Sequence, residues 1–187
     1  MKTRLCLASV AALMLTACPE VHVPIDFGAS PAQLKADEWN GLWSNPSAPE
    51  EEIRFAVDPA RPHVLVTTEN DKDDDERMEF HLRQVSKDPE HEDLFFALVP
   101  SQDPPKTATP YLLREAEDGV VFFWLIDHDT VEAGIESGAL RGKVTKPDNK
   151  GSHCSIDAIE PNYVELIKPQ YWNWLEPTCI YRSGTPD

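Results

Sequence analysis

The densest group of side chains that could do chemistry is Asp127-His128-Asp129, which directly follows an apolar run. A histidine between two carboxylates is a candidate metal ligand or general base. The alternative is structural: a strand ends here, Asp129 caps the next helix and His128 lies at the rim. Neighbouring side chains on a strand point in opposite directions, and no second histidine follows at ligand spacing. We therefore predict neither a catalytic residue nor a metal site.

A second polar pattern is Asp71, Asp73 and Asp75, which are spaced like the first ligands of a calcium loop. Such a loop also needs a glycine at its sixth position and a glutamate at its twelfth, where this chain has Glu76 and Leu82. We predict a solvated hairpin tip instead. The chain has no nucleophile elbow, phosphate-binding glycine loop or zinc-protease motif. The sequence predicts a protein without enzymatic activity or a cofactor.

The acidic composition limits the partners of the protein. The formal net charge of the 187 residues is −16. A surface of this charge repels phosphate backbones and anionic lipid headgroups. We therefore predict no nucleic-acid partner, and we expect the charge to serve solubility.

The N-terminus has the anatomy of a secretory signal. Two basic residues precede an apolar run over residues 5–15, and small residues follow it. The run is too short to span a bilayer as a helix. Leu15-Thr16-Ala17-Cys18 resembles the lipobox of bacterial lipoproteins, in which the cysteine is acylated and cleavage falls just before it. The resemblance implies a signal peptide over residues 1–17 and lipidation of Cys18.

The same resemblance predicts a location. An aspartate after the lipidated cysteine commonly marks retention in the inner membrane, whereas this chain has Pro19. We therefore expect anchoring in the outer membrane, facing the periplasm, with the lipid supplying the membrane contact. Each buried methylene contributes about 0.8 kcal/mol, so two or three acyl chains hold a protein firmly. Loss of Lys2 and Arg4 with the signal changes the formal charge from −16 to −18.

Two cysteines remain once Cys6 leaves with the signal and Cys18 is lipidated. They are Cys154 and Cys179, in a compartment that favours disulfides. A disulfide that closes this loop of about 25 residues would stabilise the fold by about 3.5 kcal/mol. Neither cysteine belongs to a Cys-x-x-Cys pair, so we predict a structural disulfide and no redox role.

Short β-rich segments dominate the chain after residue 38. Apolar residues alternate over residues 53–57 and 78–82, which is typical of half-buried strands. Residues 120–126 are apolar throughout, which predicts a strand buried on both faces. The predicted strands cover residues 39–44, 53–57, 63–68, 78–82, 93–99, 111–115, 120–126, 153–157 and 178–182. Residues 140–144 are compatible with a further short strand.

The start of the mature chain has no apolar period. Residues 18–30 carry proline, glycine and scattered polar residues, so we predict the lipidated cysteine and a tether there. A short helix is predicted from Ser30-Pro31, because serine can cap a helix and proline is tolerated at its first position. This helix should end near Glu38.

Two further helices are predicted towards the C-terminus. The first covers residues 129–138, with Asp129 as the cap and Glu132 completing a capping box. The second covers residues 161–174 and is divided or kinked by Pro169. Trp172 falls off the apolar stripe of that helix, so we expect its side chain to be exposed to a ligand or partner.

These elements indicate a single, mainly β domain over residues 31–187. Eight or nine short strands with two or three short helices favour an antiparallel barrel or a strongly curved sheet. A two-layer sandwich is the alternative, but sandwiches rarely place a helix directly after a fully apolar strand.

The opening of the strand region resembles that of the lipocalin and lipocalin-like barrels. The residues that carry this resemblance are Gly41-Leu42-Trp43, preceded by a short helix. The resemblance implies that Trp43 plugs the closed end of a barrel and that Arg182 packs over it, contributing about 0.5 to 2 kcal/mol. It also implies an internal apolar cup. The helices predicted over residues 129–138 and 161–174 differ from the family pattern and leave the strand order open.

Two functions follow from this fold. The first is a binding module for a small apolar or amphipathic molecule, with a cavity lined by Phe55, Val57, Phe80, Leu82, Phe95, Phe122 and Trp124. The second is a non-catalytic scaffold or assembly lipoprotein, whose barrel is filled by its own side chains and whose surface contacts an envelope protein. Barrels of about eight strands can be packed solid or hold one ligand.

Overall fold

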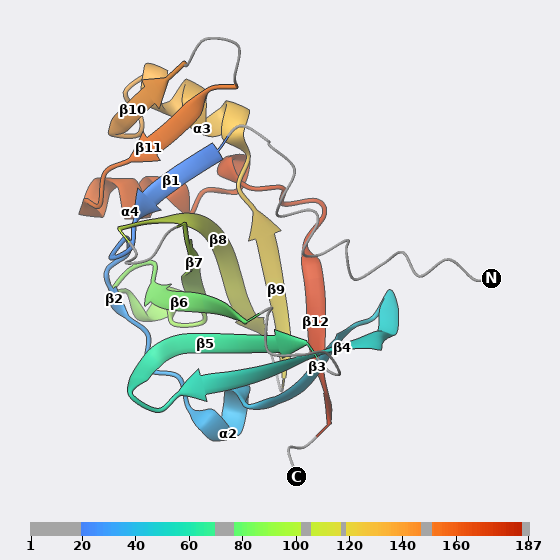
Figure 1. Ribbon diagram of the computed structural model, residues 1–187. Helices are drawn as coiled ribbons and strands as arrows, with labels where there is room; N and C mark the ends of the chain where they lie inside the picture. The colour runs from blue at the N-terminus through green and yellow to red at the C-terminus, as the bar shows by residue number, and fades with distance from the viewer. Residues whose placement is uncertain (1–19, 70–76, 102–105, 117–118, 147–150, 185–187) are drawn as a thin grey trace, which may run out of the picture.

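Eight antiparallel strands close into a barrel (Figure 1). The structure is a computed structural model that describes residues 20–69, 77–101, 106–116, 119–146 and 151–184. The barrel strands are β3 (Gly41–Asn45), β4 (Ala48–Asp58), β5 (Arg61–Glu69), β6 (Met78–Gln84), β7 (Leu94–Pro100), β8 (Thr107–Ala116), β9 (Val120–Leu125) and β12 (Thr178–Gly184). The ring closes because β12 pairs with both β9 and β3. The predicted antiparallel barrel is confirmed, and the open curved sheet and the sandwich are excluded.

Alternation along the strands fills the barrel with apolar side chains. One face of each strand contributes to this interior cluster, which includes Trp43, Phe55, Leu65, Leu82 and Leu113. All five are buried, and the three leucines have no exposed surface. Because successive residues of a strand point to opposite faces, the residues between them face outwards.

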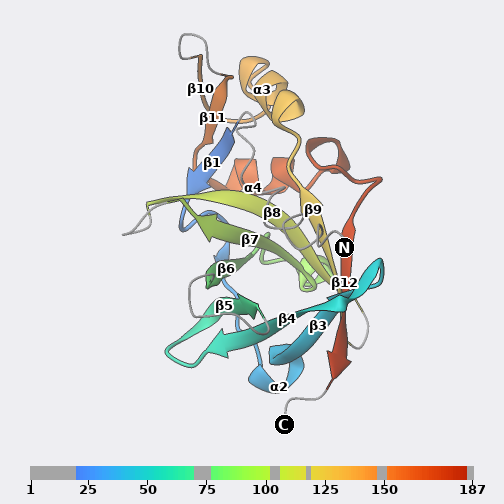
Figure 2. The ribbon, with the colours of Figure 1, turned by 45° about the vertical axis from the view of Figure 1, so that its right-hand side comes forward.

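A second unit, which we call the lobe, packs against the outside of the barrel (Figures 1 and 2). It comprises β1 (Glu20–Pro24), α3 (His128–Glu136), β10 (Gly142–Thr145), β11 (His153–Ile156), α4 (Glu160–Leu166) and the 3-10 helix η2 (Pro169–Tyr171). β1 joins the two units, because it pairs parallel to β11 and antiparallel to β8. The lobe core packs on Phe96, Leu98 and Leu112, so β7 and β8 separate two hydrophobic cores.

The segment predicted as a tether belongs to the fold. Val21, Val23 and Phe27 are at most 2% exposed and lie in the lobe core. The Val-x-Val alternation makes a strand here, and β8 and β11 supply its backbone partners. The tether prediction is therefore wrong for residues 20–30, and the described domain includes residues before position 31.

The first predicted helix is also displaced. Ser30–Pro31 forms the short strand β2, which pairs with β6. Helix α2 covers only Ala36–Trp39. The backbone N–H groups of Ala32 and Leu34 donate to carbonyls of Leu82 and Pro62, so this segment runs along the barrel before it can turn into a helix.

The later helices lie close to their predicted positions, with one change of cap. The Asp127 carboxylate accepts a hydrogen bond from the Thr130 N–H at 2.8 Å, so Asp127 caps α3 in place of the predicted Asp129. The predicted division at Pro169 is confirmed, because η2 begins there. A short 3-10 helix, η1 (Pro89–His91), lies between β6 and β7. In the described part of the chain, no helix is long and apolar enough to cross a membrane.

Candidate functional sites

One end of the barrel is covered by helix α2 and Trp43. The Trp43 side chain is 2% exposed, and its ring centroid lies 6.1 Å from that of Trp39 and 5.5 Å from that of Phe55. Its indole N–H donates to the Trp39 carbonyl at 3.1 Å. Helix α2 therefore holds Trp43 by both stacking and a hydrogen bond.

Arg182 lies beside Trp43, because the two residues are register partners on β12 and β3. The Arg182 guanidinium donates to the carbonyls of Asp37 at 3.0 Å and Asn40 at 2.7 Å. Arg182 thus fixes the end of α2 to the barrel. Its stacking over the Trp43 indole stays a prediction.

Five of the seven predicted cavity residues contribute to the barrel interior: Phe55, Val57, Phe80, Leu82 and Phe95. Phe122 and Trp124 do not, because they pack in the lobe core. On β9 the inward positions are instead those of Val121 and Phe123. The prediction for Phe122 and Trp124 is wrong because a strand that is apolar on both faces gives no alternation from which its phase can be read.

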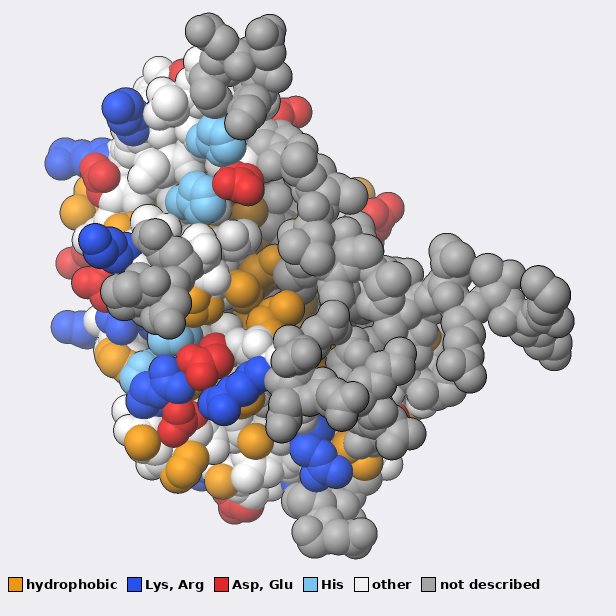
Figure 3. Space-filling model, viewed as in Figure 1, with side chains coloured by type: hydrophobic (Ala, Val, Ile, Leu, Met, Phe, Trp, Pro, Cys, Tyr) orange, Lys and Arg blue, Asp and Glu red, His pale blue; other side chains and the backbone are white. Residues whose placement is uncertain are grey.

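Several side chains of the interior cluster are only partly buried, and three of them lie towards one rim of the barrel. Met78 begins β6, Val99 lies at the end of β7 and Phe123 lies near the end of β9, and all three are only partly buried. On the face seen in Figure 3, hydrophobic side chains reach the surface between two groups of histidine and charged side chains. Met78, Val99 and Phe123 therefore keep part of their apolar surface exposed at this rim.

Tyr111 brings one polar group into the apolar interior. Its side chain is buried, which raises the pKa of the phenol to about 12. The hydroxyl therefore stays neutral at physiological pH.

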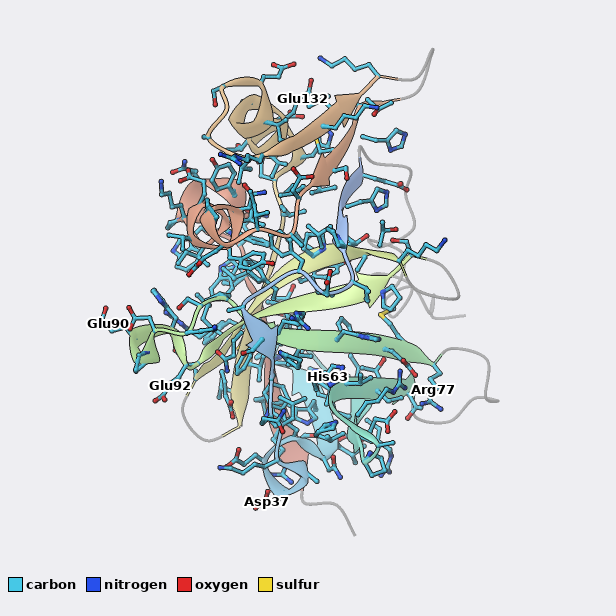
Figure 4. The ribbon with its side chains drawn as sticks, turned by 90° about the vertical axis from the view of Figure 1, so that its left-hand side faces the viewer. Asp37, His63, Arg77, Glu90, Glu92 and Glu132 are labelled. Carbon is cyan, nitrogen blue, oxygen red and sulfur yellow. The ribbon has the colours of Figure 1, made fainter. Side chains whose placement is uncertain are left out.

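The lobe gathers a cluster that the sequence analysis missed: His128, Glu132, Cys154 and Ser152. Asp127 caps α3, so the helix begins at His128. His128 and Glu132 are four residues apart and therefore lie on one face of this helix. The His128 Nε2 atom lies 3.6 Å from the Cys154 Sγ atom and 3.3 Å from the Ser152 hydroxyl. That hydroxyl also donates to the Glu132 carboxylate. Figure 4 shows Glu132 in the lobe, at the opposite end of the molecule from Asp37 on α2.

The charges around this cluster set its protonation. Burial, followed by the nearby Glu132 carboxylate, raises the pKa of the Cys154 thiol to about 11. Lys146 donates to Glu132 at 2.6 Å and, with Ser152, lowers the pKa of that carboxyl. The Cys154 side chain is therefore a neutral thiol at physiological pH, and the Glu132 carboxylate beside it is paired with Lys146.

A second group of ligand-type side chains lies on the opposite face of the same two strands. Glu20 and His22 on β1 and His153 on β11 point away from the lobe core and are partly or fully exposed. The Glu20 carboxylate lies 2.9 Å from the His22 Nε2 atom and 3.7 Å from the His153 Nδ1 atom. This surface cluster lacks a cysteine and has no buried member.

The predicted disulfide does not form, because Cys154 and Cys179 are both free. Cys154 on β11 lies opposite Val21 and Val144 of the lobe, whereas Cys179 on β12 lies opposite Phe122 of the barrel. The two cysteines therefore belong to strands that are not neighbours. The number of cysteines predicts one possible disulfide, but it does not indicate whether the two strands that carry them lie next to each other.

The prediction that Trp172 is exposed is also wrong. Its side chain is 4% exposed, and its indole N–H donates to the Leu166 carbonyl at 2.6 Å. Of these two tryptophans, Trp174 is the exposed one, at 37%, and it stacks on Trp124 with ring centroids 4.7 Å apart. Helix α4 ends at Leu166. The apolar stripe expected from a continuous helix therefore does not predict the burial of residues beyond Pro169.

Three sequence predictions lie outside the described residues: the signal peptide over residues 1–17, the lipidation of Cys18 and the hairpin tip at Asp71, Asp73 and Asp75. Comparison of the chain with family models, curated proteins and solved structures gives no significant match.

Proposed function

We propose that this protein is a lipid-anchored periplasmic binding module, whose barrel holds a small apolar or amphipathic molecule. The observation that supports it best is the change in burial along the interior. Leu65, Leu82 and Leu113 have no exposed surface, whereas Met78 and Phe123 near one rim are partly exposed. An apolar ligand entering at this rim would cover hydrophobic surface that water now contacts.

The proposed anchor is Cys18, which precedes the described domain directly. Strand β1 begins at Glu20, and consecutive Cα atoms are about 3.8 Å apart, so the lipid would hold the lobe within about 8 Å of the attachment point. The membrane is then the partner of the lobe side, at the periplasmic face of the outer membrane. Cys18→Ser should release the protein into the soluble periplasmic fraction, and continued membrane fractionation would contradict lipidation.

A scaffold or assembly lipoprotein is the second candidate, and one contact favours it. The rings of Phe80 on β6 and Phe123 on β9 lie 6.2 Å apart, although these strands are not neighbours in the ring. Side chains thus meet across the interior. If the rest of the barrel is filled in the same way, its surface is left to contact an envelope protein.

Ala97 offers a test that separates the two candidates. It is a small, fully buried residue of the interior, opposite Leu82 and Tyr111 in the strand register. In a hollow barrel, Ala97→Phe fills space that the ligand would take, so binding of a fluorescent fatty acid to the Cys18→Ser protein is lost. The melting temperature then stays close to that of the parent protein. In a filled barrel the same change destabilises the fold by about 1–3 kcal/mol.

Ala108→Phe is the matched control, because Ala108 is equally buried but belongs to the lobe core. It should destabilise the protein in either case and leave fatty-acid binding per folded molecule unchanged. If Ala97→Phe does not fold, Ala97→Val gives a smaller step in the same direction. A parent protein that binds no fatty acid at any concentration tested would contradict the binding module.

A further inference from the structure

We propose that His128, Glu132 and Cys154 form a binding site for a zinc ion in the lobe, separate from the barrel interior. The ligand atoms of these three side chains all lie within 4.8 Å of one another. They come from two elements that backbone pairing and a helix cap hold in place: α3 supplies His128 and Glu132, and β11 supplies Cys154. This site requires nothing of the proposed barrel function and can be tested by itself.

The distance between the nitrogen and sulfur atoms fits a shared zinc ion. Zinc binds imidazole nitrogen at about 2.0–2.1 Å and thiolate sulfur at about 2.3 Å, so two such ligands at a tetrahedral angle are about 3.6 Å apart. The His128 Nε2 and Cys154 Sγ atoms are 3.6 Å apart. The separation of this pair therefore matches that of two ligands of one zinc ion.

The donor set also favours zinc over the hard cations. Magnesium and calcium take oxygen ligands, whereas thiolate, imidazole and carboxylate together are a zinc set. Three protein ligands leave a fourth position. The Ser152 hydroxyl already contacts both His128 Nε2 and the Glu132 carboxylate, so it lies where it can fill that position or hydrogen-bond a water molecule that does.

The surroundings of the cluster are those of a built site rather than an exposed acidic patch. The exposed fraction is 1% for Cys154, 9% for the His128 side chain and 18% for that of Glu132. His128 uses its other ring nitrogen, Nδ1, to contact the Asp129 carboxylate at 3.2 Å. A carboxylate in this place orients a ligating imidazole with Nε2 towards the metal.

Zinc coordination requires the thiolate form of Cys154, whose side chain is buried beside the Glu132 carboxylate. Binding releases the thiol proton to solvent, the thiolate coordinates the cation, and Glu132 remains ionised with Lys146 as a second partner. The same burial argues against the other use of a Cys–His pair: a nucleophile needs access and a lowered thiol pKa, and Cys154 has neither.

The test uses cobalt(II) as a spectroscopic substitute for zinc. The full chain carrying Cys6→Ser, Cys18→Ser and Cys179→Ser retains Cys154 as its one thiol. We expect one equivalent of cobalt(II) to produce the thiolate-to-metal charge-transfer band and the visible bands of a tetrahedral site. Zinc should then abolish these bands stoichiometrically, and affinity should rise with pH because a proton is displaced.

Matched variants identify the ligands. Cys154→Ser and His128→Ala should remove the charge-transfer band, and Asp129→Asn, which removes only the orienting carboxylate, should weaken zinc binding about 10- to 100-fold. His153→Ala is the control for the surface cluster and Glu136→Gln is the control for an acidic residue one turn further along α3. Neither control should change the band. Circular dichroism of each apo variant verifies folding.

The parent protein decides the outcome even if a variant does not fold. Absence of the charge-transfer band in the folded Cys154-only protein at millimolar cobalt(II) would overturn the proposal. A band that survives His128→Ala but is lost in His153→Ala would also overturn it, because the ion would then lie at the surface cluster. Retention of fatty-acid binding in either event would leave the barrel function untouched.

Discussion

The barrel and the lobe differ in how their strands follow one another along the chain. Seven of the eight barrel strands follow one another in the chain, from β3 to β9, and each pairs with the next through a hairpin or short connection. The lobe combines β1, near the start of the described chain, with the residues between β9 and β12. The barrel interior is almost wholly apolar, whereas the lobe holds the histidine, glutamate and cysteine cluster. This cluster comes from α3 and β11, which both lie in the stretch of chain between β9 and β12.

The largest expected effect is on the barrel. Trp43→Ala removes a side chain that is 2% exposed and stacks on Trp39 and Phe55, so we expect a loss of about 3–5 kcal/mol in the free energy of unfolding. Denaturant titration measures it. A loss near zero would show that Trp43 is not a core residue of the closed end.

A matched pair on β8 separates the two cores. Leu112 faces the lobe and Leu113 faces the barrel interior, and both are fully buried. Each alanine substitution should cost about 2–5 kcal/mol. Hydrogen exchange should accelerate first in the lobe for Leu112→Ala and first in the barrel for Leu113→Ala. Identical exchange patterns would mean that the two units unfold as one.

A smaller effect concerns acid stability of the barrel. Burial lowers the pKa of His81, and the nearby His63 and Arg61 act in the same direction, while Glu79 opposes them. The unfolded chain therefore binds a proton at His81 more readily than the folded one. Stability should fall as pH drops below about 6.5, the ordinary histidine pKa. The fall should be shallower in His81→Gln and unchanged in His153→Gln, as measured by urea unfolding.

The smallest effect is expected from reduction. Because Cys154 and Cys179 are free, a reducing agent should leave the melting temperature of the protein unchanged. A disulfide closing this loop would instead contribute about 3.5 kcal/mol, which a thermal melt detects. A fall in melting temperature on reduction would contradict the strand arrangement that separates the two cysteines.

Most of the barrel could be predicted from the sequence because its strands alternate. The alternation over residues 53–57 and 78–82 shows which side chains face inwards, and both segments pair with β5, the strand between them. The apolar run of β9 has no such phase, so Phe122 and Trp124 were assigned to the wrong core. The sequence of a strand that borders two hydrophobic cores does not show which of its side chains face each core.

The lobe was harder to predict because its partners are far apart in the chain. Only Val21 and Val23 signal β1, and their pairing with β11 cannot be read from either segment alone. The cluster was missed for a local reason. With Asp127 as the cap, His128 begins the helix and shares a face with Glu132, whereas a cap at Asp129 leaves it on a strand end. A shift of two residues in one cap thus hid the candidate metal site.

The central claim, an occupied apolar barrel, is tested most directly by native mass spectrometry of the secreted Cys18→Ser protein. The native and denatured masses of one preparation are compared. We expect an adduct with the mass of a small apolar or amphipathic molecule, present in the native spectrum and lost on denaturation. A clean apo mass, together with no stabilisation by added fatty acids, would contradict the binding module and point to a filled barrel that contacts an envelope protein.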